Sequence, residues 1–186
     1  MSLRKVLFVG IPGAGKGTQA KLLIPYGFRH ISTGQIIRKA WMREDTIVMP
    51  YKEDIEAGSL LPDKEIFELI DGEINLLTNE IGYVFDGAIR NIAQAEISLK
   101  RNLVEETLYF HLDEKEAITR LNKRREIEGR KDDSLEAIAR RIEIYKRETL
   151  PVINYMAKKL IPTIVIDASK NILEVNQEIL GVLILK

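Results

Sequence analysis

A glycine-rich segment near the start of the chain has the residue types and the spacing of a phosphate-binding turn. Residues 10–18 read GIPGAGKGT and lie between an apolar run and a helical stretch. Glycines let successive backbone N–H groups turn inward onto phosphate oxygens. The following helix N-terminus adds partial positive charge, and Lys16 can reach the outer phosphates of a nucleotide. A glycine-rich turn that only connects a strand to a helix is the alternative, and the strand–loop–helix context disfavours it.

Two further positions bear on a magnesium ion. Gly17 stands where most such loops carry the Ser or Thr that binds Mg²⁺, and the hydroxyl comes one residue later, at Thr18. We therefore expect phosphates and waters to hold the metal, because Mg²⁺ readily keeps several waters. Asp86 follows the apolar run 83–85, and a carboxylate there can orient those waters. An Asp after a strand is also a common turn or cap residue, but the nearby loop favours the metal role.

The elements that must position these residues alternate along the chain. Short apolar runs, separated by longer amphipathic segments, predict strands at residues 5–9, 28–31, 83–85, 107–112 and 163–166. Such alternation predicts an α/β fold, a five-stranded parallel sheet with helices on both faces, of the P-loop NTPase type. We expect residues 1–186 to form one domain. The stretches 32–61 and 121–133 have no strand of their own, so we expect them to be excursions from the core.

Two helices are marked clearly in the sequence. One is expected to open at residues 62–63, with apolar side chains up to Leu77 at helical spacing. Another is expected after Ser134, with Leu135, Ile138, Ile142 and Tyr145 on one face. Pro151 should kink or end that second helix.

Composition excludes several classes of function. The 28 lysines and arginines equal the 28 aspartates and glutamates, which disfavours a nucleic-acid partner. The chain has no cysteine, so disulfides and thiolate zinc sites are excluded, and a cytoplasmic location is expected. No apolar run approaches the length of a membrane span, so we expect no membrane association. His30 and His111 are expected to have packing or hydrogen-bonding roles.

Five segments, in order, carry a family resemblance. The first turn resembles the phosphate loop of adenylate kinases, and later segments agree with nucleoside monophosphate kinases in order and spacing. These segments are ISTG at 31–34, AGSLLPD at 57–63, FDG at 85–87 and GRKDD at 129–133. The resemblance implies an acceptor-binding excursion near 32–61 and a short lid near 121–133. It also implies transfer of a phosphoryl group from ATP to AMP with Mg²⁺, and a monomer.

The resemblance also implies roles for individual residues. On the ATP side it implies Gly13, Ala14, Gly15, Lys16, Gly17, Thr18, Arg120, Arg124 and the backbone of Lys170. On the AMP side it implies Thr33, Arg38, Ser59, Leu60, Leu61, Gly87, Arg90, Gln94, Arg130 and Arg141. Lys16, Arg90, Arg124, Arg130 and Arg141 are the implied catalytic residues. Planar guanidinium groups suit this chemistry because each can meet two phosphate oxygens, although any one arginine alone would more often be a solvated helix residue.

The acceptor base and the activity have competing interpretations. Gln94 favours AMP, because an amide can both donate to and accept from adenine. Asn91 is more reminiscent of UMP/CMP kinases, which keeps a pyrimidine or other monophosphate as an alternative. The chain also departs from the family at Gln35, where Asp is usual, and at Ala88-Ile89, where Phe-Pro is usual. Without proline we predict a trans peptide before Ile89. These departures make a nucleotide-binding protein with weakened catalysis a third hypothesis.

Overall fold

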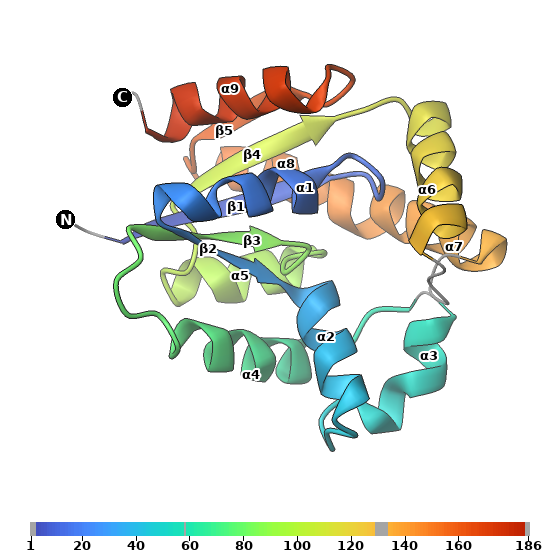
Figure 1. Ribbon diagram of the computed structural model, residues 1–186. Coiled ribbons are helices and arrows are strands. Elements are labelled where there is room, and N and C mark those ends of the chain that lie inside the picture. Colours follow the sequence, from blue (N-terminus) through green and yellow to red (C-terminus); the bar gives the residue numbers. More distant parts are fainter. Residues whose placement is uncertain (1–2, 58, 129–133, 185–186) are drawn as a thin grey trace.

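The computed structural model describes residues 3–57, 59–128 and 134–184 of the chain. Its centre is a sheet of five parallel strands in the order β2-β3-β1-β4-β5 (Figure 1). The strands are β1 Arg4–Gly10, β2 Phe28–Ser32, β3 Gly82–Asp86, β4 Glu106–His111 and β5 Thr163–Asp167. All five predicted strands are therefore confirmed, each within two residues of its predicted ends.

Helices cover both faces of the sheet, as predicted. In Figure 1, α1 and α9 lie on one side of the strands and α4 and α5 on the other. The helices are α1 Lys16–Leu22, α2 Thr33–Met42, α3 Lys52–Glu56, α4 Asp63–Ile74, α5 Ile92–Lys100, α6 Glu114–Glu128, α7 Leu135–Ile144, α8 Leu150–Lys158 and α9 Ile172–Leu183. Short 3₁₀ turns lie at Ile24–Tyr26 and Met49–Tyr51, and a π-helical turn, Tyr145–Thr149, joins α7 to α8.

The apolar run of β1 explains why both faces must be covered. Alternate side chains of a strand point to opposite faces. Val6 and Phe8 accordingly join the core beneath α1 and α9, whereas Leu7 and Val9 join the core beneath α4, α5 and α8. All four are at most 2% exposed. Burying a side chain of this size contributes about 1.5–3 kcal/mol, so β1 is anchored firmly from both sides.

The helix predictions were right about where helices begin and less accurate about their extent. Pro62 precedes α4, and the Ser134 side chain caps α7 by accepting from the Ala137 N–H. However, α4 ends at Ile74, so Leu77 lies beyond it. Leu135 is 56% exposed, so it does not join the buried face of α7. Pro151 does not end the helical path: α7 ends earlier, at Ile144, a π-helical turn follows, and Pro151 lies in the first turn of α8.

The remaining elements gather at one end of the sheet. The strands point toward α2, α3, α6 and α7, while both chain termini lie at the opposite end (Figure 1). Within the stretch 121–133, residues 121–128 continue α6, and residues 129–133 lie outside the described residues. Among the described residues, no helix is both long enough and apolar enough to cross a membrane.

Candidate active site

A large cleft of about 1080 Å³ opens at the carboxyl ends of the strands, where ligands bind in open α/β sheets. The turn after β1, the end of β3, helix α6 and the loop after β5 contribute side chains to it. A smaller pocket of about 100 Å³ adjoins it between α2, the start of α4 and the loop after β3. Gly34, Arg38, Leu60, Gly87, Arg90 and Arg141 line both cavities. The two spaces therefore share a wall that contains three arginines.

The phosphate-binding turn has the predicted context, since it leaves β1 at Gly10 and enters α1 at Lys16. Gly13 has a φ of +93°, and a Cβ on it would lie 2.7 Å from the carbonyl oxygen of Ala117. The position therefore requires glycine twice over, for its backbone conformation and for the close approach of α6. Residues 16–19 at the start of α1 line the cleft, and the first N–H groups of a helix have no partner within the helix.

Lys16 lies at the bottom of the turn. Its Nζ donates to the carbonyl oxygens of Gly10 at 2.8 Å and Ile11 at 3.1 Å. Burial lowers the pKa of Lys16 to about 8; Asp86 opposes the shift, and the charges of Arg90, Arg124 and Arg141 add to it. Burial, and to a lesser extent the surrounding arginines, therefore disfavour the protonated form of Lys16.

Asp86 ends β3 and pairs in register with Phe8 of β1 and Ser32 of β2. Burial raises the pKa of Asp86, but a hydrogen bond from His30 and the charges of Lys16 and Arg90 outweigh it and lower that pKa. His30 Nε2 lies 3.3 Å from Asp86 Oδ2. The carboxylate is therefore held ionised at the carboxyl end of β3, inside the sheet order.

The chemistry of Asp86 fits a magnesium ion that keeps its waters. A carboxylate oxygen is a hard donor, and Asp86 Oδ2 lies 3.0 Å from where a Cβ on Gly17 would stand, at the start of α1. No group of three or more His, Asp or Glu side chains within 3–57, 59–128 and 134–184 is arranged to hold a metal by itself. The donors therefore suit an ion held mainly by phosphate and water.

Hydrogen bonds hold both the backbone and the side chain of Arg90 in place. Its N–H donates to Gln94 Oε1 at 2.7 Å, its carbonyl oxygen accepts from Thr149 Oγ1 at 2.8 Å, and its Nε donates to the Gly87 carbonyl at 2.7 Å. Burial lowers the pKa of Arg90, as does the charge of Arg141, while Asp86 opposes the shift. No peptide bond is cis in the described residues, so the predicted trans bond before Ile89 is confirmed.

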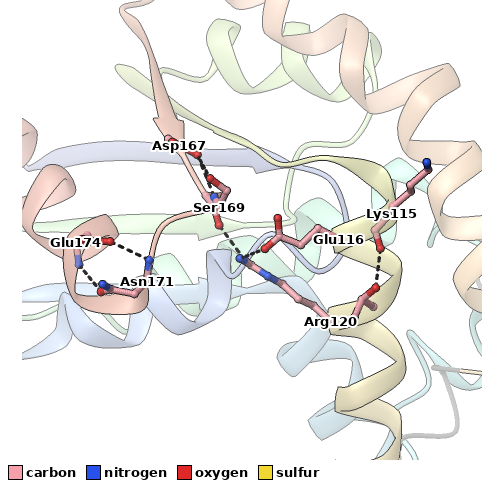
Figure 2. A network of polar contacts seen from close by, with 9 residues as sticks. Lys115, Glu116, Arg120, Asp167, Ser169, Asn171 and Glu174 are labelled. Carbon is pink, nitrogen blue, oxygen red and sulfur yellow. Dashed lines mark hydrogen bonds and ion pairs between the residues drawn. The ribbon is translucent and has the colours of Figure 1, made fainter.

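Arg120 ties α6 to the loop after β5. Figure 2 shows its guanidinium group between Glu116 and that loop, where Nη1 donates to the Ala168 carbonyl oxygen at 2.9 Å. The loop itself is held by Asp167, which accepts from Ser169, and by a capping box between Asn171 and Glu174 at the start of α9 (Figure 2). Lys170 lies in this loop and lines the cleft, with Nζ donating to Glu178 at 2.9 Å.

Gln94 lines the smaller pocket and is 2% exposed. Gln94 Nε2 donates to Asp63 Oδ1 at 2.8 Å. Asn91, by contrast, does not line either cavity; its side chain caps α5 by accepting from the Gln94 N–H at 2.8 Å. The residue that suggested a pyrimidine acceptor therefore has a structural explanation. Thr33 Oγ1 donates to the Gly87 carbonyl at 2.8 Å and holds α2 to this pocket.

Comparison with known proteins agrees with this arrangement. A family profile described as "Adenylate kinase" matches residues 8–161. The chain belongs to the adenylate kinase family. It is 37% identical to an adenylate kinase from Porphyromonas gingivalis over 161 residues, which are 83% of this chain and 82% of the relative. It is 40% identical to one from Thermus thermophilus over 157 residues, 81% of each chain. It is 36% identical to one from Prochlorococcus marinus over 181 residues, 95% of this chain and 96% of the relative.

For this adenylate kinase family member, the structure brings most of the sequence-predicted residues together. Those predicted on the ATP side line the larger cleft, namely Gly13, Ala14, Gly15, Lys16, Gly17, Thr18, Arg120, Arg124 and Lys170. Those predicted on the AMP side line the smaller pocket, namely Thr33, Arg38, Ser59, Leu60, Leu61, Gly87, Arg90, Gln94 and Arg141. Asp86 lines the larger cleft, as does Gln35. Arg130 lies outside the described residues.

Three residues of the site were missed by sequence reasoning. Asp63, Thr149 and His30 each hold a predicted site residue through a hydrogen bond between segments 31 to 59 positions apart. His30 carried a signal, since a histidine beside a strand was expected to form a hydrogen bond. Asp63 lies in the segment 57–63 of the family resemblance, but no role was expected for it. Neither spacing nor periodicity in the sequence indicates such partners.

Proposed function

We propose that this chain transfers the γ-phosphoryl group of ATP to AMP, giving two molecules of ADP, with Mg²⁺ bound to the nucleotide phosphates. One observation carries the proposal. Lys16, Arg38, Arg90, Arg124 and Arg141 line a single cleft between the phosphate-binding turn and the smaller pocket. Several cations around one cleft attract nucleotide phosphates, and each guanidinium group can meet two phosphate oxygens. Membership of the adenylate kinase family supports the same reaction.

The donor nucleotide is assigned to the larger cleft. Backbone N–H groups of residues 13–18 would bind the β- and γ-phosphates, and Lys16 would contact the outer ones. Arg120 and the backbone at Lys170 would contact the base, because α6 and the loop after β5 meet at the far end of this cleft. The 1080 Å³ volume is ample for a nucleoside triphosphate.

The acceptor nucleotide is assigned to the smaller pocket. Its wall combines apolar side chains with Gln94, a polar group that can recognise the base edge. Thr33, Gly87 and the backbone of residues 59–61 would contact the nucleoside. Arg38 and Arg90, which line both cavities, would hold the acceptor phosphate between the two sites.

In the transfer step, an oxygen of the AMP phosphate forms a bond to the γ-phosphorus while the bond from that phosphorus to the β–γ bridging oxygen breaks. The protein contributes in-line positioning and neutralises charge on the equatorial oxygens. Lys16, Arg90, Arg124 and Arg141, which line one cleft, would take this role, and the family resemblance adds Arg130. A single arginine acting on such a transition state accelerates transfer by about 10³–10⁵-fold.

Asp86 would hold the magnesium ion through a bound water, in agreement with its ionised state. The ion, when bound, supplies positive charge to the β- and γ-phosphate oxygens and fixes their orientation. We also propose that residues 32–61 and 121–133 act as the acceptor-binding excursion and the short lid, and that the enzyme is a cytoplasmic monomer.

An acceptor panel tests the function. ADP formation is measured with Mg·ATP and, in turn, AMP, UMP, CMP and GMP, using a coupled assay. We expect AMP to give the highest kcat/KM. A higher value with UMP or CMP would make the chain a pyrimidine monophosphate kinase, and tight ATP binding without transfer to any acceptor would identify a binding protein.

A further inference from the structure

The side chain of Gln94 is fixed in one amide orientation by two neighbours. Nε2 donates to Asp63 Oδ1 at 2.8 Å, and Oε1 accepts from the Arg90 N–H at 2.7 Å. A carboxylate at neutral pH only accepts hydrogen bonds, and a backbone N–H only donates. Rotating the amide by half a turn would place two acceptors together at Asp63 and two donors together at Arg90. Both contacts therefore select the same orientation.

We propose that Asp63 is a specificity-determining residue, which makes the acceptor pocket select bases that carry an exocyclic amino group beside a ring-nitrogen acceptor. This inference rests on the proposed assignment of the acceptor to the smaller pocket. Asp63 is the first residue of α4, where the helix dipole favours a carboxylate. Asn91 Nδ2, at 3.5 Å from the same Oδ1, is a second and weaker donor to this carboxylate.

The chemistry of the remaining amide atoms gives the selection its direction. After its contacts with Asp63 and Arg90, Gln94 retains one N–H on Nε2 and one acceptor position on Oε1. Adenine matches both, because its ring nitrogen accepts and its N6 amino group donates. A 6-oxopurine presents a ring N–H and a carbonyl oxygen instead, the reverse pattern. A freely rotating glutamine would match both bases equally well, so discrimination depends on holding the amide still.

Burial makes the constraint effective. Gln94 is 2% exposed and lies at the pocket wall with Leu61, Ile66 and Ala88. Water therefore cannot easily replace a mismatched hydrogen bond, and each polar group left unsatisfied weakens binding by about tenfold or more. The contact with the Arg90 backbone persists in any side-chain variant of Asp63. Removing Asp63 should thus relax the selection without abolishing it.

The test compares two acceptors that differ at the purine 6-position and the N1 proton, AMP and inosine monophosphate (IMP). The quantity measured is the ratio of kcat/KM for AMP to kcat/KM for IMP, in which the concentration of folded enzyme cancels. Asp63→Asn replaces the acceptor-only carboxylate beside Gln94 with an amide that can donate as well as accept. The asparagine can therefore form a hydrogen bond with either orientation of the Gln94 amide. We expect the AMP:IMP ratio to fall about tenfold, mainly because transfer to IMP becomes faster.

Glu65→Gln is the matched control. Glu65 lies in the same first turn of α4 and also carries a negative charge, but it accepts a hydrogen bond from the Tyr51 hydroxyl at 3.3 Å, and it lines neither cavity. We expect its AMP:IMP ratio to equal that of the unmodified chain. If Asp63→Asn does not fold, Asp63→Ser removes the same acceptor-only group with a residue suited to helix N-termini.

An unchanged AMP:IMP ratio in the Asp63 variants, or an equal fall in Glu65→Gln, would overturn the inference. Failure of the proposed function is distinguishable, since the unmodified chain would then transfer to no monophosphate, or would transfer to UMP or CMP with a higher kcat/KM than to AMP. In that event the same ratio is measured from equilibrium dissociation constants of AMP and IMP. An unchanged ratio of dissociation constants in Asp63→Asn would overturn the inference on binding alone.

Discussion

Replacing Lys16 by methionine should separate the contribution of this residue to catalysis from its cost to stability. We expect Lys16→Met to lose measurable phosphoryl transfer, because no other side chain of the turn can bring a positive charge to the outer phosphates. We also expect the variant to lose a specific dependence of stability on pH. The reason is that burial and three arginines lower the pKa of Lys16 to about 8.

The sign and size of that dependence follow from the shift. The folded-state pKa, about 8, lies below the ordinary lysine pKa of 10.5, so between these values the unfolded chain binds more protons than the folded chain. The free energy of unfolding therefore rises with pH across this window. A shift of this size corresponds to about 3 kcal/mol in total, of which about 2–3 kcal/mol develops between pH 7 and pH 10.

The assay is urea unfolding at pH 7, 8, 9 and 10, without nucleotide and in phosphate-free buffer. The unfolding free energy of Lys16→Met is subtracted from that of the unmodified chain, which cancels every other titrating group. This difference should rise by about 2–3 kcal/mol from pH 7 to pH 10. Lys158→Met, at the exposed end of α8, is the control, and its difference should stay level. A level difference for Lys16→Met as well would refute the claim that burial in the folded chain lowers the pKa of Lys16.

Three further substitutions probe the same site. Thr149→Val removes the hydroxyl that donates to the Arg90 carbonyl oxygen. We expect it to lower the unfolding free energy by about 1 kcal/mol and to reduce kcat/KM for AMP. Unchanged values of both would contradict the role of Thr149 in holding Arg90. Gly87 has a φ of +72°, and a Cβ on it would lie 3.1 Å from Arg90 Nη2. We expect Gly87→Ala to lower the unfolding free energy measured in urea by about 1–2 kcal/mol and to slow transfer. Transfer at the rate of the unmodified chain would contradict the claim that Arg90 needs this space. Gln35→Asp restores a carboxylate to the cleft and should raise kcat/KM two- to fivefold, about 0.5–1 kcal/mol, whereas Gln35→Asn should not.

The sheet and its helices were predictable because burial on both faces leaves a plain signature. The run from Lys5 to Val9 is apolar almost throughout, since Val6 and Phe8 face one core and Leu7 and Val9 the other. The phosphate-binding turn was predictable for a related reason. Its glycines are required by the local backbone conformation, as the φ of Gly13 illustrates, so the pattern appears within a few consecutive residues of the sequence.

The partners of the site residues were not predictable in the same way. Asp63 reads in the sequence as a residue of a helix start, which it is, and nothing there indicates that its carboxylate also holds Gln94. Thr149 lies in a π-helical turn, which shifts side chains relative to an α-helix, so helical spacing does not show that it reaches Arg90. The exposure of Leu135 has a similar origin, because periodicity identifies a face without showing what covers its first residue.

The most direct test of the central claim is a crystal structure of the chain with a non-hydrolysable ATP analogue, Mg²⁺ and AMP. We expect the triphosphate to accept hydrogen bonds from the backbone N–H groups of residues 13–18, and the AMP phosphate to contact Arg38 and Arg90. The adenine of AMP should lie against Gln94. Phosphates bound away from the turn, or an AMP phosphate without contact to either arginine, would contradict the claim that these cations gather two nucleotides in one cleft.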